Sequence, residues 1–355
     1  MTPTKVIVLY GGKSTEHEVS VHSAQTVCRL LSAQPDKYQI YPVFISKQGY
    51  WFLQRECSEQ TPQDVPVTPV LRPDATLQTA NGELIAADVI FPVVHGTNCE
   101  DGTLQGFLET LNIPYVGCGV LTSALGMDKE LTKLLAREVG IAVVPYQKVS
   151  RGVAYDKDAL TKWVQERLPV FVKPVRLGSS VGVTRVTSVE QLGPALENAL
   201  QFDTDALVEQ GVDHAREIFC GVYGDGKTVK TSACGELRTV AGEFFDYNAK
   251  YVVAGGCETQ VPAYIPTRTA EAMRQDSERL FRALQGYGLA RVDYLMDKNG
   301  QYYMSEINTL PGMSETSLFP QLFEASGENY REILDTLIQI AKEVHARKGA
   351  LATSR

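Results

Sequence analysis

Two acidic residues near the end of the chain are placed to bind a divalent cation. Residues 289–296 and 301–308 are strand-like, and the Asn-Gly pair at 299–300 favours a two-residue type I′ turn between them. In that register Asp293 faces Glu306 on one side of a hairpin. Two opposed carboxylates repel each other unless a cation lies between them or one of them is protonated. The hairpin therefore predicts a metal site, with a solvated polar face as the alternative.

Arg291 and Asn308 share that face of the hairpin in the same register. The Asn308 amide oxygen extends the two carboxylates to an oxygen-only donor set. This set suits Mg2+, because the ion takes its other ligands from water and phosphate. The turn at 309–313 contains Gly312, which lets backbone N–H groups approach a ligand, so an oxyanion could be held there beside Arg291. The alternating residues should fill the core on the opposite face: Val292, Tyr294 and Ile307.

A lysine and a loop of small residues could hold phosphate groups. The strand-like run at 170–173 ends in Lys173, and residues 178–182 read Gly-Ser-Ser-Val-Gly. Small side chains expose backbone N–H groups to anionic oxygens, which indicates phosphate binding, although the spacing is not that of a P-loop. The Gly-Gly pair at 11–12 does not form the G-x-G-x-x-G fingerprint, so a dinucleotide dehydrogenase is disfavoured.

Two carboxylates follow at a junction between strands. Glu209 ends a strand-like run at 206–209, and Glu217 begins the next strand. A carboxylate in such a place can accept hydrogen bonds from a ribose hydroxyl or an adenine amine. The alternative is an ordinary residue between two domains.

Residues 242–256 show no clear periodicity. A loop of this length in a compact enzyme is usually functional or disordered. We interpret it as a lid that brings Lys250 and Tyr251 over bound phosphate and excludes water. A surface loop packed by its own aromatic residues is the alternative.

An alternation of strands and helices positions these residues. In the first third of the chain, helical periodicity separates strand-like runs at 6–10, 40–45 and 89–94. This pattern predicts an open parallel sheet with ligands beyond the carboxyl ends of its strands, where the polar loops 11–18 and 95–102 lie. A second unit begins near Thr122 with a helix that carries Leu131, Leu134 and Leu135. The 355 residues suffice for two or three domains, which we place at 1–121, 122–210 and 211–347, with 348–355 as a tail.

Composition excludes several classes of protein. Apolar residues make up 44% of the chain and charged residues 21%, as in ordinary globular proteins, and no apolar run reaches the ~20 residues of a membrane span. The net charge of 34 − 42 = −8 disfavours nucleic acid as a partner. The chain start lacks a signal-peptide core, so we expect a cytoplasmic protein. Seven cysteines without a C-x-x-C pair or zinc spacing are expected to be reduced and mostly to serve packing.

The ordered motifs together resemble the D-alanine–D-alanine ligases of the ATP-grasp superfamily. The resemblance runs from residue 5 to 337 and rests on residues 11–20, 95–96, 100–102, 127–129, 173–182, 247–251, 291–293 and 306–312. It implies an α/β, three-domain ATP-grasp fold, in which an N-terminal Rossmann-like open parallel sheet precedes two α+β domains. ATP would lie between the second and third domains, and the amino acids near the first.

The resemblance also implies roles for individual residues. ATP would contact Lys129, Lys173, Ser179, Ser180, Glu209, Gln210, Gly211, Val212, Glu217 and Lys250. Two Mg2+ ions, which Mn2+ could replace, would be bound by Asp293, Glu306 and Asn308. Glu16 would bind the ammonium group of the first D-alanine, with Ser179 and Tyr251 across the site and His95 near the substrate carboxylate. Arg291 and Gly312 would hold the oxyanion. Ser317 and Leu318 would border the second amino acid.

The activity that this resemblance implies is the ATP-dependent joining of two D-alanine molecules through a D-alanyl phosphate, for peptidoglycan precursors. Tyr251 matches the branch that forms dipeptides, and D-serine remains open as the acceptor. Homodimers are usual in the family. Two alternatives remain: another ATP-grasp ligase that joins a different acid and amine, and a nucleotide-gated binding protein without turnover.

Overall fold

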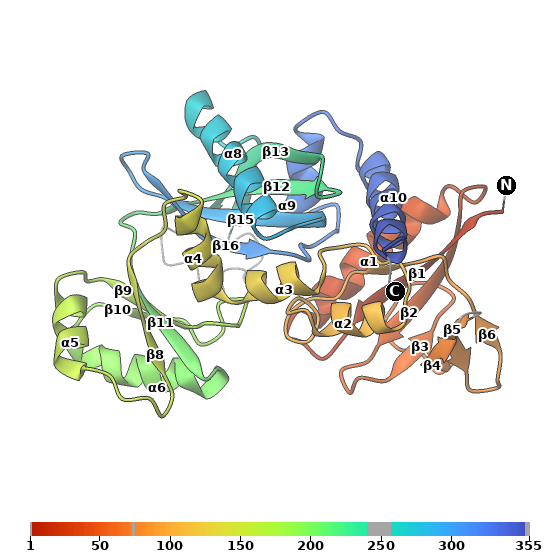
Figure 1. The fold of residues 1–355 in the computed structure, drawn as a ribbon, viewed down its shortest axis with the longest axis horizontal. Coiled ribbons are helices and arrows are strands. Elements are labelled where there is room, and N and C mark those ends of the chain that lie inside the picture. Colours follow the sequence, from red (N-terminus) through yellow and green to blue (C-terminus); the bar gives the residue numbers. More distant parts are fainter. Residues whose placement is uncertain (1, 73–74, 240–256, 352–355) are drawn as a thin grey trace.

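Three β-sheets with helices packed on them form the computed structural model of the chain, which describes residues 2–72, 75–239 and 257–351 (Figure 1). The expected α/β fold is confirmed. The domain boundaries at residues 121, 210 and 347 remain predictions. No helix within the described ranges is long and apolar enough to cross a membrane.

The N-terminal sheet has the strand order β6-β5-β4-β3-β2-β1-β7. Its strands are β1 (Thr4–Gly11), β2 (Tyr38–Ile45), β3 (Trp51–Leu53), β4 (Val65–Arg72), β5 (Ala75–Thr79), β6 (Leu84–Ile85) and β7 (Val89–Pro92). Only β2, β1 and β7 are parallel, as the sequence predicts for these three strands, and β3 to β6 add an antiparallel extension. The helices that follow β1 and β7 are α1 (His17–Ser32), α2 (Thr103–Thr110) and α3 (Val120–Met127).

The central sheet is antiparallel in the order β10-β9-β11-β8. Its elements are β8 (Tyr146–Ser150), α5 (Lys157–Gln165), β9 (Val170–Pro174), β10 (Thr184–Val186), the 3-10 turn η1 (Val189–Gln191), α6 (Leu192–Phe202) and β11 (Asp205–Gln210). Leu160 and Val164 of α5 and Leu196 of α6 fill its core. The helix before this sheet, α4 (Lys129–Glu138), begins where the Asp128 carboxylate accepts the N–H of Leu131. Figure 1 shows α3 and α4 running between the central sheet and the rest of the molecule.

The C-terminal sheet has the order β14-β13-β12-β15-β16, with every neighbouring pair antiparallel. Its strands are β12 (Arg216–Gly224), β13 (Val229–Thr239), β14 (Cys257–Gln260), β15 (Gly288–Met296) and β16 (Tyr302–Asn308). Its helices are α8 (Thr267–Ala283), α9 (Leu318–Glu324) and α10 (Tyr330–Gly349). The last helix packs against two sheets, because Leu334 and Leu337 lie in one core cluster with residues of β12 and β15 as well as of α1 and β1, and Figure 1 shows α10 beside α1.

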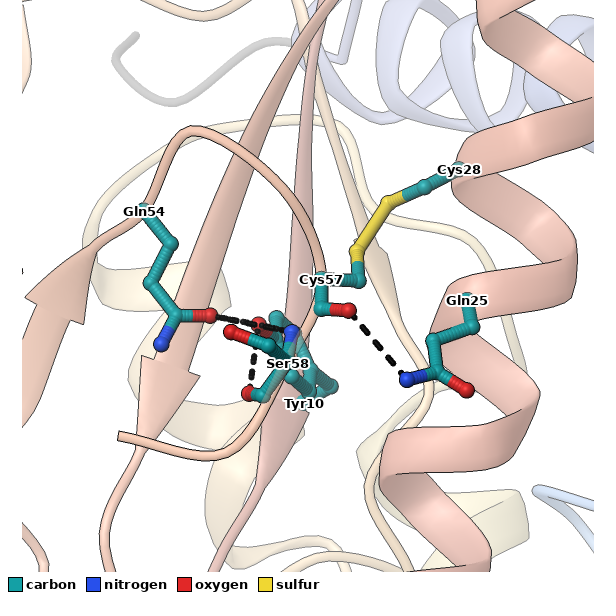
Figure 2. Close-up of a disulfide and its surroundings, with 6 residues drawn as sticks. All are labelled: Tyr10, Gln25, Cys28, Gln54, Cys57 and Ser58. Carbon is teal, nitrogen blue, oxygen red and sulfur yellow. Dashed lines mark hydrogen bonds between the residues drawn. A yellow bond between two sulfur atoms is a disulfide. The ribbon is translucent and has the colours of Figure 1, made fainter. Parts of the chain in front are cut away.

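One cysteine prediction is wrong. Cys28 on α1 and Cys57 in the loop after β3 form a disulfide, and in Figure 2 the Gln25 amide donates a hydrogen bond to the Cys57 carbonyl beside it. The pair lies 29 residues apart, so no local spacing could reveal it, and the docking of the loop on α1 brings the two thiols together. The packing expectation holds for the buried free thiols of Cys99, Cys118, Cys220 and Cys234.

Candidate active site

The predicted pairing of the acidic residues is confirmed. Asp293 on β15 pairs with Glu306 on β16, and Arg291 pairs with Asn308. The predicted turn is wrong, however. A type I′ turn needs positive φ at two residues, whereas only Gly300 of the 299–300 pair has one, at 82°. The Asp297 N–H donates to the Gln301 carbonyl at 2.8 Å, so the turn contains three residues.

A β-bulge at Ser305 compensates for the longer turn. Tyr294 pairs with Met304 but Asp293 pairs with Glu306, which leaves Ser305 as the extra residue on β16. Without this residue Glu306 would move to the opposite face, because side chains alternate along a strand. That opposite face is the expected core, since Val292, Tyr294 and Ile307 are no more than 4% exposed.

Basic side chains lie next to both acids. The Arg291 guanidinium donates from Nε and Nη2 to the two oxygens of Asp293, each at 2.7 Å. Lys129 Nζ lies 3.2 Å from Oε2 of Glu306. The negative charges of Asp293 and Glu306 are therefore compensated by Arg291 and Lys129, whereas the sequence predicts a metal ion in this role.

The hairpin nevertheless fits Mg2+ by the chemistry of its donors. Two carboxylates and the Asn308 amide offer only oxygen, and each carboxylate oxygen has a second lone pair beyond its contact with a cation. The Asn308 oxygen also accepts the N–H of Leu310 at 3.0 Å, which fixes the amide orientation. Within the described part of the chain no three His, Cys, Asp or Glu side chains cluster as a metal site, so the candidate set depends on this amide as its third ligand.

One cavity brings together predicted residues from all three sheets and their connections. It is lined by Glu16, Lys129, Ser179, Arg291, Glu306 and Asn308, together with residues that sequence reasoning had not assigned, such as Glu100 and Thr309. Glu16 lies at the N-cap of α1, directly beyond the carboxyl end of β1, as expected for a ligand site on a parallel sheet. Lys250 and Tyr251 lie outside the described residues.

The loop after β9 has a backbone suited to anion binding. Ser179 and Ser180 have positive φ values of 54° and 57°, which are uncommon for residues other than glycine. The buried Ser179 hydroxyl has no hydrogen-bond partner among the described residues. Lys129 Nζ donates to the Leu177 carbonyl at 2.7 Å and so joins this loop to the acidic hairpin. A strained loop with a hydroxyl at the edge of a cavity is a candidate contact for a ligand.

Glu209 lies between two lysines. Its carboxylate is 2.7 Å from Lys173 Nζ and 3.2 Å from Lys133 Nζ. Burial alone would raise the pKa of Glu209, but the two lysines outweigh it and hold that pKa below its usual value. Burial lowers the pKa of Lys133 to about 8, in spite of Glu209. Sequence reasoning missed Lys133, although its place four residues after Lys129 puts both lysines on one helix face.

The neighbouring predicted ATP contacts lie along the connection from β11 to β12. The N–H groups of Gln210 and Gly211 donate to the carbonyls of Pro145 and Pro169, each at 2.9 Å, and Val212 follows them. Glu217 on β12 lies between Leu237 of β13 and Leu295 of β15.

His95 is buried next to Glu100, which lines the cavity, but His95 is not itself among the lining residues. Its Nδ1 donates to the Leu310 carbonyl at 2.8 Å and lies 3.5 Å from Glu100, whereas Nε2 has no partner among the described residues. Burial opposes the charged form of His95, but Glu100 outweighs it, so the pKa of His95 lies above its usual value.

Ser317 lines a different groove, and the cavity lining includes neither it nor Leu318. Ser317 is the N-cap of α9, which begins at Leu318, and the groove lies between it and α1, with Val19 and His22 on the helix side. The Gly312 backbone is close to Ser317, because a Cβ at Gly312 would lie 2.8 Å from Ser317 Oγ. The serine predicted at the second amino acid thus lines a groove beside α1, whereas Glu16 and Arg291 line the cavity.

A serine-containing loop that Lys129 joins to an acidic hairpin, at a cavity next to a parallel sheet, is the arrangement expected of an ATP-dependent ligase with the ATP-grasp fold. Residues 5–118 match the family model described as D-ala D-ala ligase N-terminus, and residues 135–339 match D-ala D-ala ligase C-terminus. The chain belongs to the D-alanine–D-alanine ligase family.

Individual relatives match this chain over nearly their full length. The chain is 41% identical to a D-alanine–D-alanine ligase of Thermoanaerobacter sp., over 98% of this chain and 99% of the relative. The D-alanine-D-alanine ligase structure from Coxiella burnetii superposes with a TM-score of 0.87 at 32% identity, covering 98% and 97% of the two chains. The D-Ala:D-Ser ligase VanG from Enterococcus faecalis superposes with a TM-score of 0.84 at 32% identity, covering 96% and 99%. The chain is thus an enzyme of the ligase class, and its family uses ATP.

Proposed function

We propose that this enzyme joins two D-alanine molecules through a D-alanyl phosphate, with ATP as phosphoryl donor, and so supplies D-alanyl-D-alanine for peptidoglycan precursors. The observation that carries this proposal is the shared cavity. It combines Glu16 beside the parallel sheet, the Ser179 loop of the central sheet and the Arg291 and Glu306 ribbon of the C-terminal sheet. The relatives named above support the same activity over the whole chain length.

The first step activates a carboxylate. A carboxylate resists attack by an amine because it is anionic and lacks a good leaving group, so ATP converts it to an acyl phosphate. Lys129, Lys173 and Lys250 would contact the phosphates, together with the N–H groups and hydroxyls of Ser179 and Ser180. Positioning and charge compensation supply most of the catalysis in such a transfer. The segment from Glu209 to Val212 would border the adenine, and Glu217 would accept hydrogen bonds from the ribose.

Asp293, Glu306 and Asn308 would hold two Mg2+ ions, or Mn2+ in their place. When bound, the metal neutralises charge on the phosphates during transfer. The side chains would orient the ions through their oxygens. Arg291 would hold Asp293 in its present orientation, since its fork contacts both carboxylate oxygens.

The second step forms the amide bond. Glu16 would bind the ammonium of the first D-alanine, with Ser179 and Tyr251 across the site and His95 near its carboxylate. The amine of the second D-alanine, bordered by Ser317 and Leu318, would attack the acyl carbon. Arg291 and the Gly312 N–H would stabilise the oxyanion, and such a donor contributes roughly 3 kcal/mol. Phosphate then leaves.

The family resemblance supports three further proposals: a homodimer, a cytoplasmic location, and domains at 1–121, 122–210 and 211–347. Light scattering on the purified chain measures its mass in solution. A monomer at micromolar concentration would contradict the dimer.

A product assay tests the function. The enzyme with ATP and Mg2+ is given D-alanine alone, then D-alanine with D-serine or D-lactate, and both ADP and the ligated product are measured. We expect ADP release that depends on D-alanine and yields the dipeptide. The likeness to a D-Ala:D-Ser ligase keeps D-serine as the second candidate acceptor. ATP binding without any phosphoryl transfer would instead favour a binding protein.

A further inference from the structure

Lys133 is a buried cation to which none of the steps above assigns a role. It is 0% exposed, and it lies on α4 one helical turn after Lys129, which is 7% exposed. The same helix leaves Leu131 and Leu134 44% and 47% exposed. A helix that buries lysines and exposes leucines reverses the usual amphipathic order, so the buried lysines need an explanation other than the hydrophobic core.

The contacts of Lys133 reach two different sheets. Its Nζ donates to the Ser305 carbonyl on β16 at 3.0 Å and lies 3.2 Å from Glu209 on β11. Lys129 likewise contacts two parts of the structure, Glu306 on β16 and the Leu177 carbonyl in the loop after β9. One face of α4 therefore connects the acidic hairpin to the central sheet.

The carbonyl that Lys133 binds belongs to the bulged residue itself. Ser305 is the extra residue that places Glu306 and Asn308 on the face of Asp293. Residues in a bulge lose part of their ladder hydrogen bonding, so a charged donor on the bulged carbonyl stabilises the bulge.

We propose that Lys133 is a positioning residue for the acidic hairpin. It would orient the hairpin by binding the main-chain carbonyl of the bulged residue Ser305. This proposal rests on the proposed function, because it assumes that Asp293, Glu306 and Asn308 bind Mg2+. The competing role is that of a counter-ion for Glu209, which would affect the nucleotide and not the metal in particular.

The test measures binding without turnover. ADP binding to the full-length protein is titrated calorimetrically in EDTA, and then at a fixed ADP concentration with increasing Mg2+. In Lys133→Met we expect the Mg2+ midpoint to rise at least about 10-fold, as when other groups that orient metal ligands are removed, and ADP affinity in EDTA to change less than about threefold. The control is Lys148→Met. Lys148 lies on β8, is partly exposed, and pairs with Glu130 of α4, so both the Mg2+ midpoint and the ADP affinity of this variant should match those of the wild type.

Two outcomes would overturn the proposal. The first is an unchanged Mg2+ midpoint in Lys133→Met. The second is a loss of ADP affinity that is equal with and without Mg2+, because this loss would identify Lys133 as a counter-ion for Glu209. If Lys133→Met does not melt cooperatively, Lys133→Gln undergoes the same titrations. It keeps an N–H donor for the Ser305 carbonyl but removes the charge beside Glu209, so we expect a smaller rise of the Mg2+ midpoint, and an equal loss of ADP affinity with and without Mg2+ would overturn the proposal. A wild-type protein that binds ADP equally with and without Mg2+ would refute the proposed metal site itself. A Mg2+-dependent wild type with an unaffected variant would refute only the role of Lys133.

Discussion

At the scale of single residues, the site consists of opposite charges held at short range. Arg291 contacts Asp293 through two hydrogen bonds, and Lys129 contacts Glu306. Opposite charges at this range offset the repulsion between the two carboxylates.

Replacement of Glu306 tests the acidic ribbon directly. Glu306→Gln removes one of the charges proposed to bind the metal and keeps the shape, so we expect turnover to fall by at least about 100-fold. The melting temperature should stay close to that of the wild type, because the Lys129–Glu306 pair is partly exposed and contributes little stability. ADP release and a thermal melt measure the two effects, and unchanged activity would show that the metal assignment is wrong.

Glu16 gives a second prediction at this scale. Glu16→Gln removes the charge that would bind the first ammonium group, and a charge-assisted hydrogen bond contributes about 2 kcal/mol. We expect the KM for D-alanine to rise about 30-fold while the KM for ATP changes less than threefold. Steady-state kinetics with each substrate varied separately distinguishes the two, and a parallel rise in both constants would argue against this role.

At the scale of elements, helices from distant parts of the chain hold the loop that carries Gly312. The Ser23 hydroxyl of α1 accepts the N–H of Met313 at 3.1 Å, and the Tyr330 hydroxyl of α10 donates to the Met313 carbonyl at 2.6 Å. Both side chains are buried, so water cannot replace them as partners. The loop is therefore fixed from both sides of its main chain.

Loss of one of these bonds should affect the second substrate most. Tyr330→Phe leaves the Met313 carbonyl without this donor, at a cost of about 1–2 kcal/mol in unfolding free energy. Because Ser317 follows in the same loop, the KM for the second D-alanine should rise more than the KM for ATP. Urea unfolding and initial-rate kinetics measure both quantities, and equal KM changes would contradict this account.

The C-terminal sheet gives a pH-dependent prediction. Burial would raise the pKa of Glu236, but Arg216 and Arg238 outweigh it and lower that pKa. Because the pKa is lower in the folded state, this interaction stabilises the fold above the unfolded pKa of about 4.3, and the stabilisation is lost as pH falls through the folded pKa. Glu236→Gln should thus cost about 2 kcal/mol at pH 7 and much less at pH 3. Urea unfolding at both pH values tests this, and an equal difference at both would refute it.

At the scale of the whole molecule, the first and last parts of the chain share one core. Leu334 and Leu337 of α10 belong to the same buried cluster as Val6 and Val8 of β1 and Leu31 of α1. Hydrophobic side chains that pack together in this way lose stability together. The N-terminal sheet and α10 should therefore unfold as one unit, despite the predicted boundary at residue 121.

Leu334→Ala tests this shared core. Leu334 is 0% exposed, and truncation of such a residue costs about 3 kcal/mol. We expect amide hydrogen exchange to become faster in both α10 and β1. The exposed Leu351, at 69%, provides the matched control, because Leu351→Ala should change neither segment. Faster exchange confined to α10 would contradict a shared core.

The sequence alone determined the features that depend on neighbours along the chain. Strand alternation with an assumed two-residue turn predicted the pairing of Asp293 with Glu306, which is right although the turn is wrong. The order of motifs predicted the family and the three-domain fold class. Alternation along a strand extends over only a few residues, so it can be read without the fold.

Only the tertiary structure decided what depends on elements far apart in the chain. It joined Cys28 to Cys57, buried Lys133 between β11 and β16, and placed Ser317 in a groove beside α1. It also restored the hairpin register through the Ser305 bulge after a three-residue turn that the sequence had not predicted. The burial of a charge and the partner of a thiol are set by packing between distant elements, and no local pattern carries that information.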